Sequence, residues 1–184
     1  MTTARYQIPR DGLSADQLRA CETFTRLTGH PLQGPFAVWL DRPHLILPLL
    51  GVFDALRTKV DLDVRLQKLM ILAVARHWSA QFEWHTHAPL ARKAGVTEDV
   101  ISAIAHRQPV TFERDDERVV YAVVQELNET RALTDETFAA AERVLGHSVL
   151  VELIVAMGYF VMIAITLNAF RVLPANGAEP LPKG

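Results

Sequence analysis

Apolar residues recur every three or four positions along most of the chain, which is the periodicity of amphipathic helices. Runs that alternate polar and apolar residues between Asn-Gly or Asp-Gly turns, the usual mark of strand hairpins, do not occur. The pattern therefore predicts an all-α fold, a bundle of about eight helices joined by short connections. The expected helical segments are about 14–28, 34–40, 43–56, 61–77, 82–94, 97–106, 112–127, 134–146 and 148–171.

Residues at the ends of these segments indicate where the helices begin and end. The expected N-caps are Ser14, Asp61, Ser79, Thr97 and Thr134. Gly95 is expected to close one helix as a left-handed residue. Pro48 lies inside the segment that starts at Pro43, so that helix is expected to be kinked or to start later. On the segment after Phe112 the acids and Arg118 are expected to face outward.

The segment from Val149 to Leu167 is apolar nearly all round and has the length of a membrane span. It contains Glu152, and Arg171 is its one positive flank. Because it is the single such segment among amphipathic helices, a buried helix is favoured over a span. We expect no membrane partner and a homo-oligomer, as a dimer, trimer or hexamer, in which this helix is covered.

Length and composition are those of one ordinary domain. The 184 residues are expected to form a single domain, 1–184, with an N-terminal arm at 1–12 and a C-terminal tail at 174–184. Hydrophobic residues make up 49%, which is ample for a core, and the net charge of -2 gives no field that would attract nucleic acid. The lone Cys21 and the absence of a signal-peptide core at the N-terminus favour the cytoplasm.

The densest polar cluster is Phe82-Glu83-Trp84-His85-Thr86-His87. On a helix Glu83 and His87, four apart, share one face, whereas His85 points elsewhere. A surface ion pair is the commonest meaning of this spacing. The pair is also suited to proton transfer, because a carboxylate beside an imidazole raises the imidazole pKa and fixes its tautomer. A zinc site would need at least a third ligand, and no spacing supplies one. Arg65 and Arg76 are possible binding groups for a substrate carboxylate or plain surface charges.

Several spaced motifs around this cluster resemble a known family. They are Ala73-Val74-Ala75, then Glu83-Trp84-His85-Thr86-His87-Ala88-Pro89-Leu90-Ala91, then Gly95-Val96, with Gly34 to Phe36 upstream and Gly158-Tyr159 and Asn168 late in the chain. Together they resemble the carboxymuconolactone decarboxylase family, which includes alkyl hydroperoxidase D. The resemblance extends over about residues 30–172 and implies an all-α fold that often assembles as trimers or hexamers.

The resemblance also shows two departures. The peroxidase branch carries CxxC followed by a histidine, and its cysteine positions fall here on Ala80 and Glu83, while the histidine is kept as His87. Disulfide-based peroxide reduction needs an attacking and a resolving sulfur, so thiol peroxidase activity is disfavoured. An Arg-Glu pair of the family is replaced by Gln67-Lys68, which puts a lysine where a proton-relay acid stands in the peroxidase branch.

The first functional hypothesis is a cofactor-free lyase or isomerase, related to decarboxylases of aromatic compound degradation, that acts on a small carboxylated lactone or oxo acid. His87 would donate or shuttle the proton and Glu83 would orient it. Trp84 would form a pocket wall and Lys68 would hold an anionic substrate or intermediate. The alternatives are a catalytically diverged binding or structural oligomer on the same fold and, third, a metal-dependent enzyme that uses Glu83 and His87. No metal or other cofactor is expected under the first hypothesis.

Overall fold

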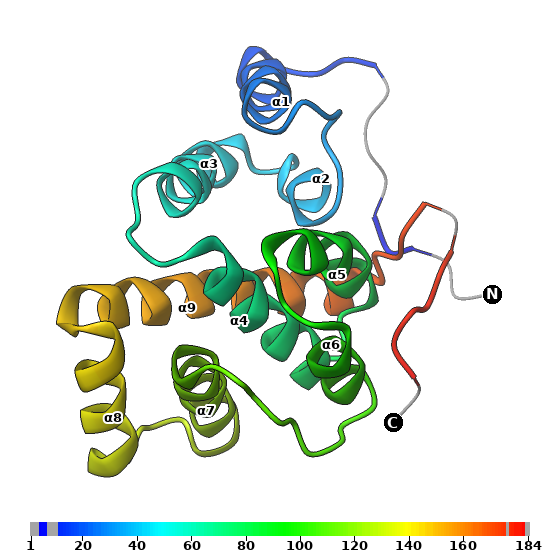
Figure 1. The fold of residues 1–184 in the computed structure, drawn as a ribbon. Coiled ribbons are helices and arrows are strands. Elements are labelled where there is room, and N and C mark those ends of the chain that lie inside the picture. The colour runs from blue at the N-terminus through cyan, green and yellow to red at the C-terminus, as the bar shows by residue number, and fades with distance from the viewer. Residues whose placement is uncertain (1–3, 7–10, 176, 183–184) are drawn as a thin grey trace.

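The structure is a computed structural model that describes residues 4–6, 11–175 and 177–182. These residues form nine α-helices and no strand, so the predicted all-α class is confirmed (Figure 1). The helices are α1 (Ala15–Thr28), α2 (Pro35–Trp39), α3 (Pro43–Thr58), α4 (Val64–His77), α5 (Gln81–Ala94), α6 (Glu98–Ala105), α7 (Asp115–Thr130), α8 (Asp135–Leu145) and α9 (His147–Phe170).

Most of the predicted helix ends follow from local capping. The hydroxyls of Ser14, Thr97 and Thr134 accept hydrogen bonds from backbone N–H groups in the first turns of α1, α6 and α8, as predicted. Gly95 ends α5 with φ of 100°, a left-handed conformation that glycine adopts without strain. Helix α3 begins at Pro43, where a missing N–H costs nothing, and continues through Pro48.

Two predicted caps are wrong. Asp63, not Asp61, caps α4, and its side chain accepts a hydrogen bond from the Arg65 N–H. The backbone N–H groups of Asp61 and Leu62 donate to the Glu152 carboxylate on α9. This contact also accounts for an acid inside an otherwise apolar helix. The residue that caps α5 is Ala80, which has no side-chain acceptor. Ser79 has φ of 50° and its hydroxyl accepts a hydrogen bond from Arg76.

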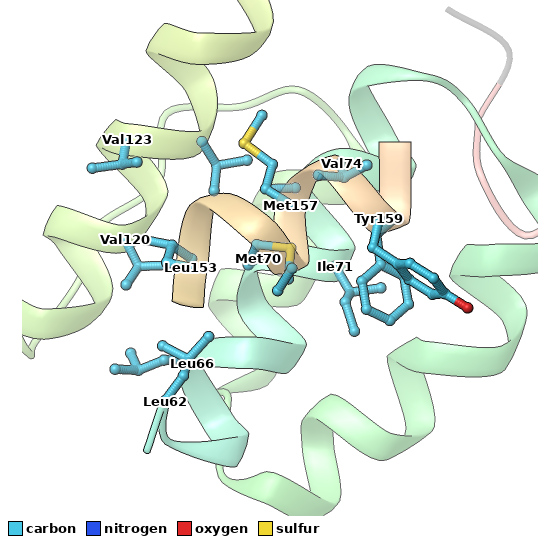
Figure 2. Packing of buried hydrophobic residues seen from close by; sticks show 14 of the residues in the cluster. Leu62, Leu66, Met70, Ile71, Val74, Val120, Val123, Leu153, Met157 and Tyr159 are labelled. Carbon is cyan, nitrogen blue, oxygen red and sulfur yellow. The ribbon is translucent and has the colours of Figure 1, made fainter. Parts of the chain in front are cut away.

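Helix α4 is the centre of the molecule (Figure 1). It packs against α5, α7 and α9, while α1 to α3 form a layer at one end and α8 bridges α7 and α9. Figure 2 shows the core that these contacts create, in which Leu66 and Met70 of α4 pack with Val120 of α7 and Leu153 of α9. A charged pair also joins α4 to α7. Glu117 of α7 was expected to face outward, but it is buried and accepts a hydrogen bond of 2.5 Å from Arg65 of α4.

Helix α9 is the one helix among the described residues that is long and apolar enough to cross a membrane. Less than half of its most apolar stretch, 44%, is buried inside the molecule. Its exposed large apolar side chains are Val151, Ile154, Val155, Ile165 and Phe170. They lie at helical spacing along one side, so α9 carries an uncovered apolar stripe opposite the face that packs on α4.

The described parts of the predicted arm and tail lie against the helices. The N–H of Arg5 donates to the carbonyl of Phe170 at the end of α9. Leu181 is 2% exposed and belongs to the hydrophobic cluster formed by α4, α5 and α6. Its backbone exchanges two hydrogen bonds with the Gln81 side chain, which is the first residue of α5. The segment near the C-terminus therefore stabilises the start of α5.

Candidate active site

A pocket of about 490 Å³ opens where α1, α2 and α3 meet α4, α5 and α9. Five of the eight phenylalanines in the chain line it, together with a small number of polar side chains. The lining residues are Phe24, Leu27, Thr28, His30, Gln33, Pro35, Phe36, Phe53, Leu56, Arg57, Gln67, Lys68, Phe82, Glu83, Thr86, His87, Leu90, Phe160 and Ile163. An apolar pocket with a few convergent polar groups is the usual form of a small-molecule site.

The pair predicted from helical spacing lies at the inner wall of this pocket. His87 Nε2 is 3.5 Å from Glu83 Oε1, one turn apart on α5. The Glu83 side chain is 3% exposed and that of His87 is 14% exposed, so both are removed from bulk water. The His87 ring also packs edge-on against Phe160 of α9, with 5.6 Å between ring centroids. The surface ion pair is therefore the wrong interpretation of this spacing.

Burial changes the protonation of both groups. It raises the pKa of Glu83 to about 8, and the nearby Lys68 offsets only part of this rise. Burial and Lys68 lower the pKa of His87 to about 3. The sequence-based expectation that the carboxylate raises the imidazole pKa is wrong, because Glu83 itself is mostly uncharged at neutral pH. The pair is then a carboxylic acid against a neutral imidazole.

Two polar atoms of the pair have no hydrogen-bond partner within the described part of the chain. They are Glu83 Oε1 and His87 Nδ1, both fully enclosed. Native proteins rarely leave buried polar atoms unpaired, and such atoms mark places where a ligand or an ordered water completes the bonding. The unpaired atoms lie in the pocket wall, so they are suited to meet polar groups of a bound molecule.

Lys68 supplies the cationic or basic group of the pocket. It lies on α4, is half-buried, and interacts electrostatically with Glu83. Burial lowers the pKa of Lys68, and the attraction of Glu83 counteracts this less strongly. Its neighbour Gln67 also lines the pocket but donates a hydrogen bond of 2.7 Å to the carbonyl of Leu56, which ties α4 to the end of α3.

Other residues singled out in the sequence lie elsewhere. Trp84 does not line the pocket, because it is buried on the opposite side of α5 in the cluster with α4 and α6. His85 is exposed, as its helical position predicts. Arg65 is paired with Asp116 and Glu117, and Arg76 lies outside the pocket lining. Neither arginine therefore reaches the site.

The remaining candidates also lie outside the pocket lining. Cys21 is half-buried on α1 and takes no part in it. Over residues 4–6, 11–175 and 177–182, no three His, Cys, Asp or Glu side chains gather closely enough to hold a metal ion. Glu83 and His87 thus have no third protein ligand there.

Sequence patterns missed most of the pocket. On α5 itself, Phe82, Thr86 and Leu90 lie on the same side as Glu83 and His87, and their spacing is a signal that identifies them. The lining residues from α1 to α3 have no such signal, because those helices meet α5 through contacts between distant parts of the chain. The contact of Gly34 with Phe82 is one example. Gly34 approaches Phe82 so closely that a Cβ atom there would lie 2.7 Å from the ring.

Known proteins share this architecture. Residues 49–126 match the profile of the Carboxymuconolactone decarboxylase family. A peroxidase-related protein from Ralstonia eutropha JMP134, an alkylhydroperoxidase AhpD core, superposes with a TM-score of 0.76 at 13% identity over 100% of both chains. A peroxidase-related protein from Silicibacter sp. TM1040 gives 0.74 at 10% identity, over 93% of this chain and 91% of that one.

A third solved structure holds a small ring compound. It is a cysteine-to-alanine variant of the debrominase Bmp8 in complex with 2,3,4-tribromopyrrole, with a TM-score of 0.73 and 15% identity over 98% of this chain and 95% of that one. No curated protein matches the sequence. At these identities the superpositions establish the fold, while the match at 49–126 is a match of sequence.

The nine helices and the pocket on α5 thus define an all-α protein of the alkylhydroperoxidase-core type. The matching segment contains α4, α5 and α6 complete, with the acid, the imidazole and the lysine of the pocket. The chain is thus similar to the carboxymuconolactone decarboxylase family over residues 49–126, and it shares the fold of the alkylhydroperoxidase-core proteins.

Proposed function

We propose that this protein is a cofactor-free lyase or isomerase that acts on a small carboxylated lactone or oxo acid by proton transfer through Glu83 and His87. The observation that carries the proposal is the buried, mutually contacting acid and imidazole on the wall of an apolar pocket of about 490 Å³. Perturbed titratable groups that converge in such a pocket are typical of catalytic sites.

The protonation of the pair supports two different roles. Glu83 holds a proton at neutral pH, since its pKa is raised to about 8, and it is the proton donor. Neutral His87 lies against Glu83 and orients it, because a pKa of about 3 leaves no imidazolium to donate and makes the ring a weak base. These roles reverse the sequence-based hypothesis, in which His87 gives the proton and Glu83 orients it. Lys68 is the group that meets the negative charge of the substrate.

The family position of these residues argues against peroxide reduction through a disulfide. Ala80 and Glu83 stand where the peroxidase branch has cysteines, and Cys21 lies on α1 away from the pocket lining. Bmp8, which shares the fold, binds a substituted five-membered ring. A compact cyclic or branched acid is accordingly the kind of substrate we propose.

The alternative is a diverged binding or structural oligomer. It would be favoured by a pocket without convergent polar groups, whereas Lys68, Glu83 and His87 line this one. A metal-dependent reaction at Glu83 and His87 lacks a third protein ligand among the described residues. The proton-transfer reaction therefore has the better structural support.

The test is turnover of carboxylated lactones and oxo acids followed by ultraviolet absorbance, with Glu83→Gln and His87→Gln as variants. Loss of a general acid or base typically lowers kcat about 10²- to 10⁴-fold, and we expect that range for each variant. His85→Gln is the matched control, because it changes an exposed imidazole on the same helix. A folded His87→Gln protein that turns over a verified substrate at the wild-type rate contradicts the proposal.

We further propose that the protein works in the cytoplasm as a homo-oligomer, a dimer, trimer or hexamer, without nucleic acid or membrane as a partner. The support is the apolar stripe along α9, which includes Val151, Val155 and Ile165 and stays uncovered in the single chain. Exposed apolar stripes of this kind are characteristic of protein interfaces.

A further inference from the structure

Lys68 is the one lysine side chain in the pocket lining, and its place there is unusual for a surface-type residue. It stands on α4, whose neighbouring positions are almost all buried. Within the described residues, no hydrogen bond and no ion pair of 4.0 Å or less connects its amine to another side chain. Buried lysines are normally paired, so an amine kept without a close partner needs another explanation.

Two roles fit an amine at this position. As an ammonium it would hold the carboxylate of a substrate by charge alone. As a neutral amine it would be a nucleophile, because an uncharged nitrogen has a free electron pair. The surroundings favour the second role. Five phenylalanine rings line the pocket, and its lining includes a second cation, Arg57. Burial lowers the pKa of Lys68 more than the attraction of Glu83 raises it.

The neighbouring acid supplies what an amine nucleophile requires. Formation of an imine needs a proton donor for the carbonyl oxygen, which leaves as water. Glu83 faces the same pocket, interacts with Lys68 and carries a proton at neutral pH. Its enclosed Oε1 atom lies 3.5 Å from His87 Nε2 and has no hydrogen-bond partner among the described residues, so the carboxyl group is not held by another protein group.

From these contacts we propose that Lys68 is a covalent catalyst whose Nζ forms a Schiff base with the ketone carbonyl of a β-oxo acid. The inference rests on the proposed function and narrows its substrate from a lactone or oxo acid to a β-oxo acid. The chemistry is then a decarboxylation in which the protein itself supplies the electron acceptor.

The reaction balances without an oxidant or reductant. The Nζ electron pair forms the N–C bond, Glu83 protonates the departing oxygen, and water leaves to give a protonated imine. The bond to the carboxylate then breaks, CO₂ departs, and its electron pair moves to the imine nitrogen to form an enamine. A proton from Glu83, replenished from solvent, adds to the carbon. Water hydrolyses the imine and frees the amine. One oxo acid carboxylate and one proton thus become one ketone and one CO₂.

The inference is tested by borohydride trapping. The full-length protein is incubated with benzoylacetate, or separately with acetoacetate, in the presence of sodium borohydride, and the modified peptide is mapped by mass spectrometry. Reduction converts a Schiff base into a stable secondary amine. We expect an adduct with the mass of the reduced ketone imine on Lys68, at a level at least about 10-fold above that on Lys93, an exposed lysine of α5.

Lys68→Arg separates the two roles. It keeps the positive charge but cannot form an imine, so we expect loss of trapping and at least a 100-fold lower kcat. Lys93→Arg is the control and is expected to behave as the wild type. Wild-type turnover in a folded Lys68→Arg variant, or trapping no stronger at Lys68 than at Lys93 with both oxo acids, overturns the inference. If Lys68→Arg fails to fold, the site-mapped trapping of the wild type still decides.

Failure of the inference and failure of the proposed function have different signatures. If turnover depends on Glu83 and His87 while trapping is absent, the proton-transfer function stands and Lys68 is only an electrostatic group. If Lys68 is trapped but Glu83→Gln and His87→Gln leave turnover unchanged, the covalent role stands and the proposed proton pathway falls.

Discussion

Glu83 and His87 respond to the same burial in opposite ways, because one is charged when it loses a proton and the other when it gains one. Their contact of 3.5 Å is therefore between neutral groups near pH 7. A neutral pair is less costly to bury than a charged one, which explains how the site tolerates such an apolar setting. It also leaves the acid ready to donate a proton near pH 7.

This pair makes a specific prediction for stability against pH. The pKa of Glu83 rises from 4.5 to about 8 on folding, so its contribution is full below pH 4.5 and is lost as pH rises through 8. The pKa of His87 falls from 6.5 to about 3, so its contribution is full above pH 6.5 and is lost as pH falls through 3. The two slopes oppose each other from pH 4.5 to 6.5.

Urea unfolding of the wild type and two variants measures these slopes. We expect Glu83→Gln to remove a decline of up to about 1 kcal/mol per pH unit between pH 6.5 and 8, and His87→Gln to remove the opposite decline below pH 4.5. His85→Gln is the control. Parallel curves for Glu83→Gln and the wild type above pH 6.5 would contradict the raised pKa of Glu83.

Local spacing was enough to identify this pair but not its chemistry. Four residues of separation predict the contact, because one helix contains both side chains. The direction of each pKa shift is set by burial, and Lys68 of α4 adds to the shift of His87 while it opposes that of Glu83. Trp84, next to Glu83 in sequence, turns to the other side of α5 and packs in a separate cluster. Which side of α5 meets the pocket depends on helices that lie far away in the sequence.

Contacts between helices hold the pocket in place, and the best defined joins α4 to α7. The Arg65 guanidinium donates to Glu117 at 2.5 Å and to Asp116 at 2.6 Å. Arg65 and Glu117 are both buried, at 8% and 3% exposure. A charge that loses its partner in such a place is expensive, so this pair fixes how α7 lies against the helix that carries Lys68.

Glu117→Ala is expected to lower the free energy of unfolding by about 3–5 kcal/mol, because it leaves the buried guanidinium with Asp116 alone. Asp115→Ala is the matched control on the same turn of α7. Asp115 forms an exposed pair with Arg118, whose loss costs less than about 1 kcal/mol. Equal losses for the two variants in chemical denaturation would show that the Arg65 contact contributes little.

Gly34 fixes the approach of α2 to α5. It has φ of 61°, and a Cβ atom there would lie 2.7 Å from Phe82 Cε1 in the pocket wall. Gly34→Ala is expected to cost more stability than Gly29→Ala, because Gly29 has φ of 76° but open space around it. The backbone penalty at Gly29, which is in the left-handed helical region, is about 1–2 kcal/mol, whereas Gly34 has ψ of -139° and lies outside that region.

A double variant isolates the steric part. Phe82→Leu removes ring atoms at the contact, so the Gly34→Ala penalty should be smaller in that background by at least about 0.5 kcal/mol. Thermal unfolding of the four proteins in this cycle measures the coupling. Full additivity would mean that the Phe82 ring moves aside freely.

The ends of helices were easier to predict than their packing. Ser14, Thr97 and Thr134 cap by bonds within a few residues, and sequence alone identifies them. Asp61 is not a cap, because α4 begins at Val64 with Asp63 as its cap, and the Asp61 N–H donates to Glu152, 91 residues later. The sequence pattern predicted that Glu117 faces water, but Glu117 is buried with Arg65, which lies 52 residues earlier. The local periodicity of apolar residues cannot predict a contact with a residue so far away in the sequence.

The chain as a whole presents an apolar stripe on α9 that no described residue covers. Val155 is 52% exposed and Ile165 46%, both on a helix whose other side forms the main core. The proposed homo-oligomer would bury this stripe, which is the basis for the next prediction.

Sedimentation or light scattering on the wild type is expected to give a multiple of the 20.6 kDa chain mass. Val155→Glu with Ile165→Lys should shift the protein toward the monomer while preserving the helical circular dichroism. Leu18→Lys is the control, because Leu18 is 49% exposed and lies on α1, which packs against α3. A wild type that is monomeric at all concentrations tested would contradict the proposed assembly.

The hydrogen bonds between Gln81 and Leu181 have a consequence for folding during synthesis on the ribosome. The first residue of α5 is made 100 residues before its hydrogen-bond partner. Because synthesis adds roughly 5–20 residues per second, α5, which carries Glu83 and His87, is made about 5–20 s before Leu181. These bonds can therefore form only after Leu181 has been made, and a truncated chain that stops before Leu181 would leave the start of α5 open to proteases and chaperones.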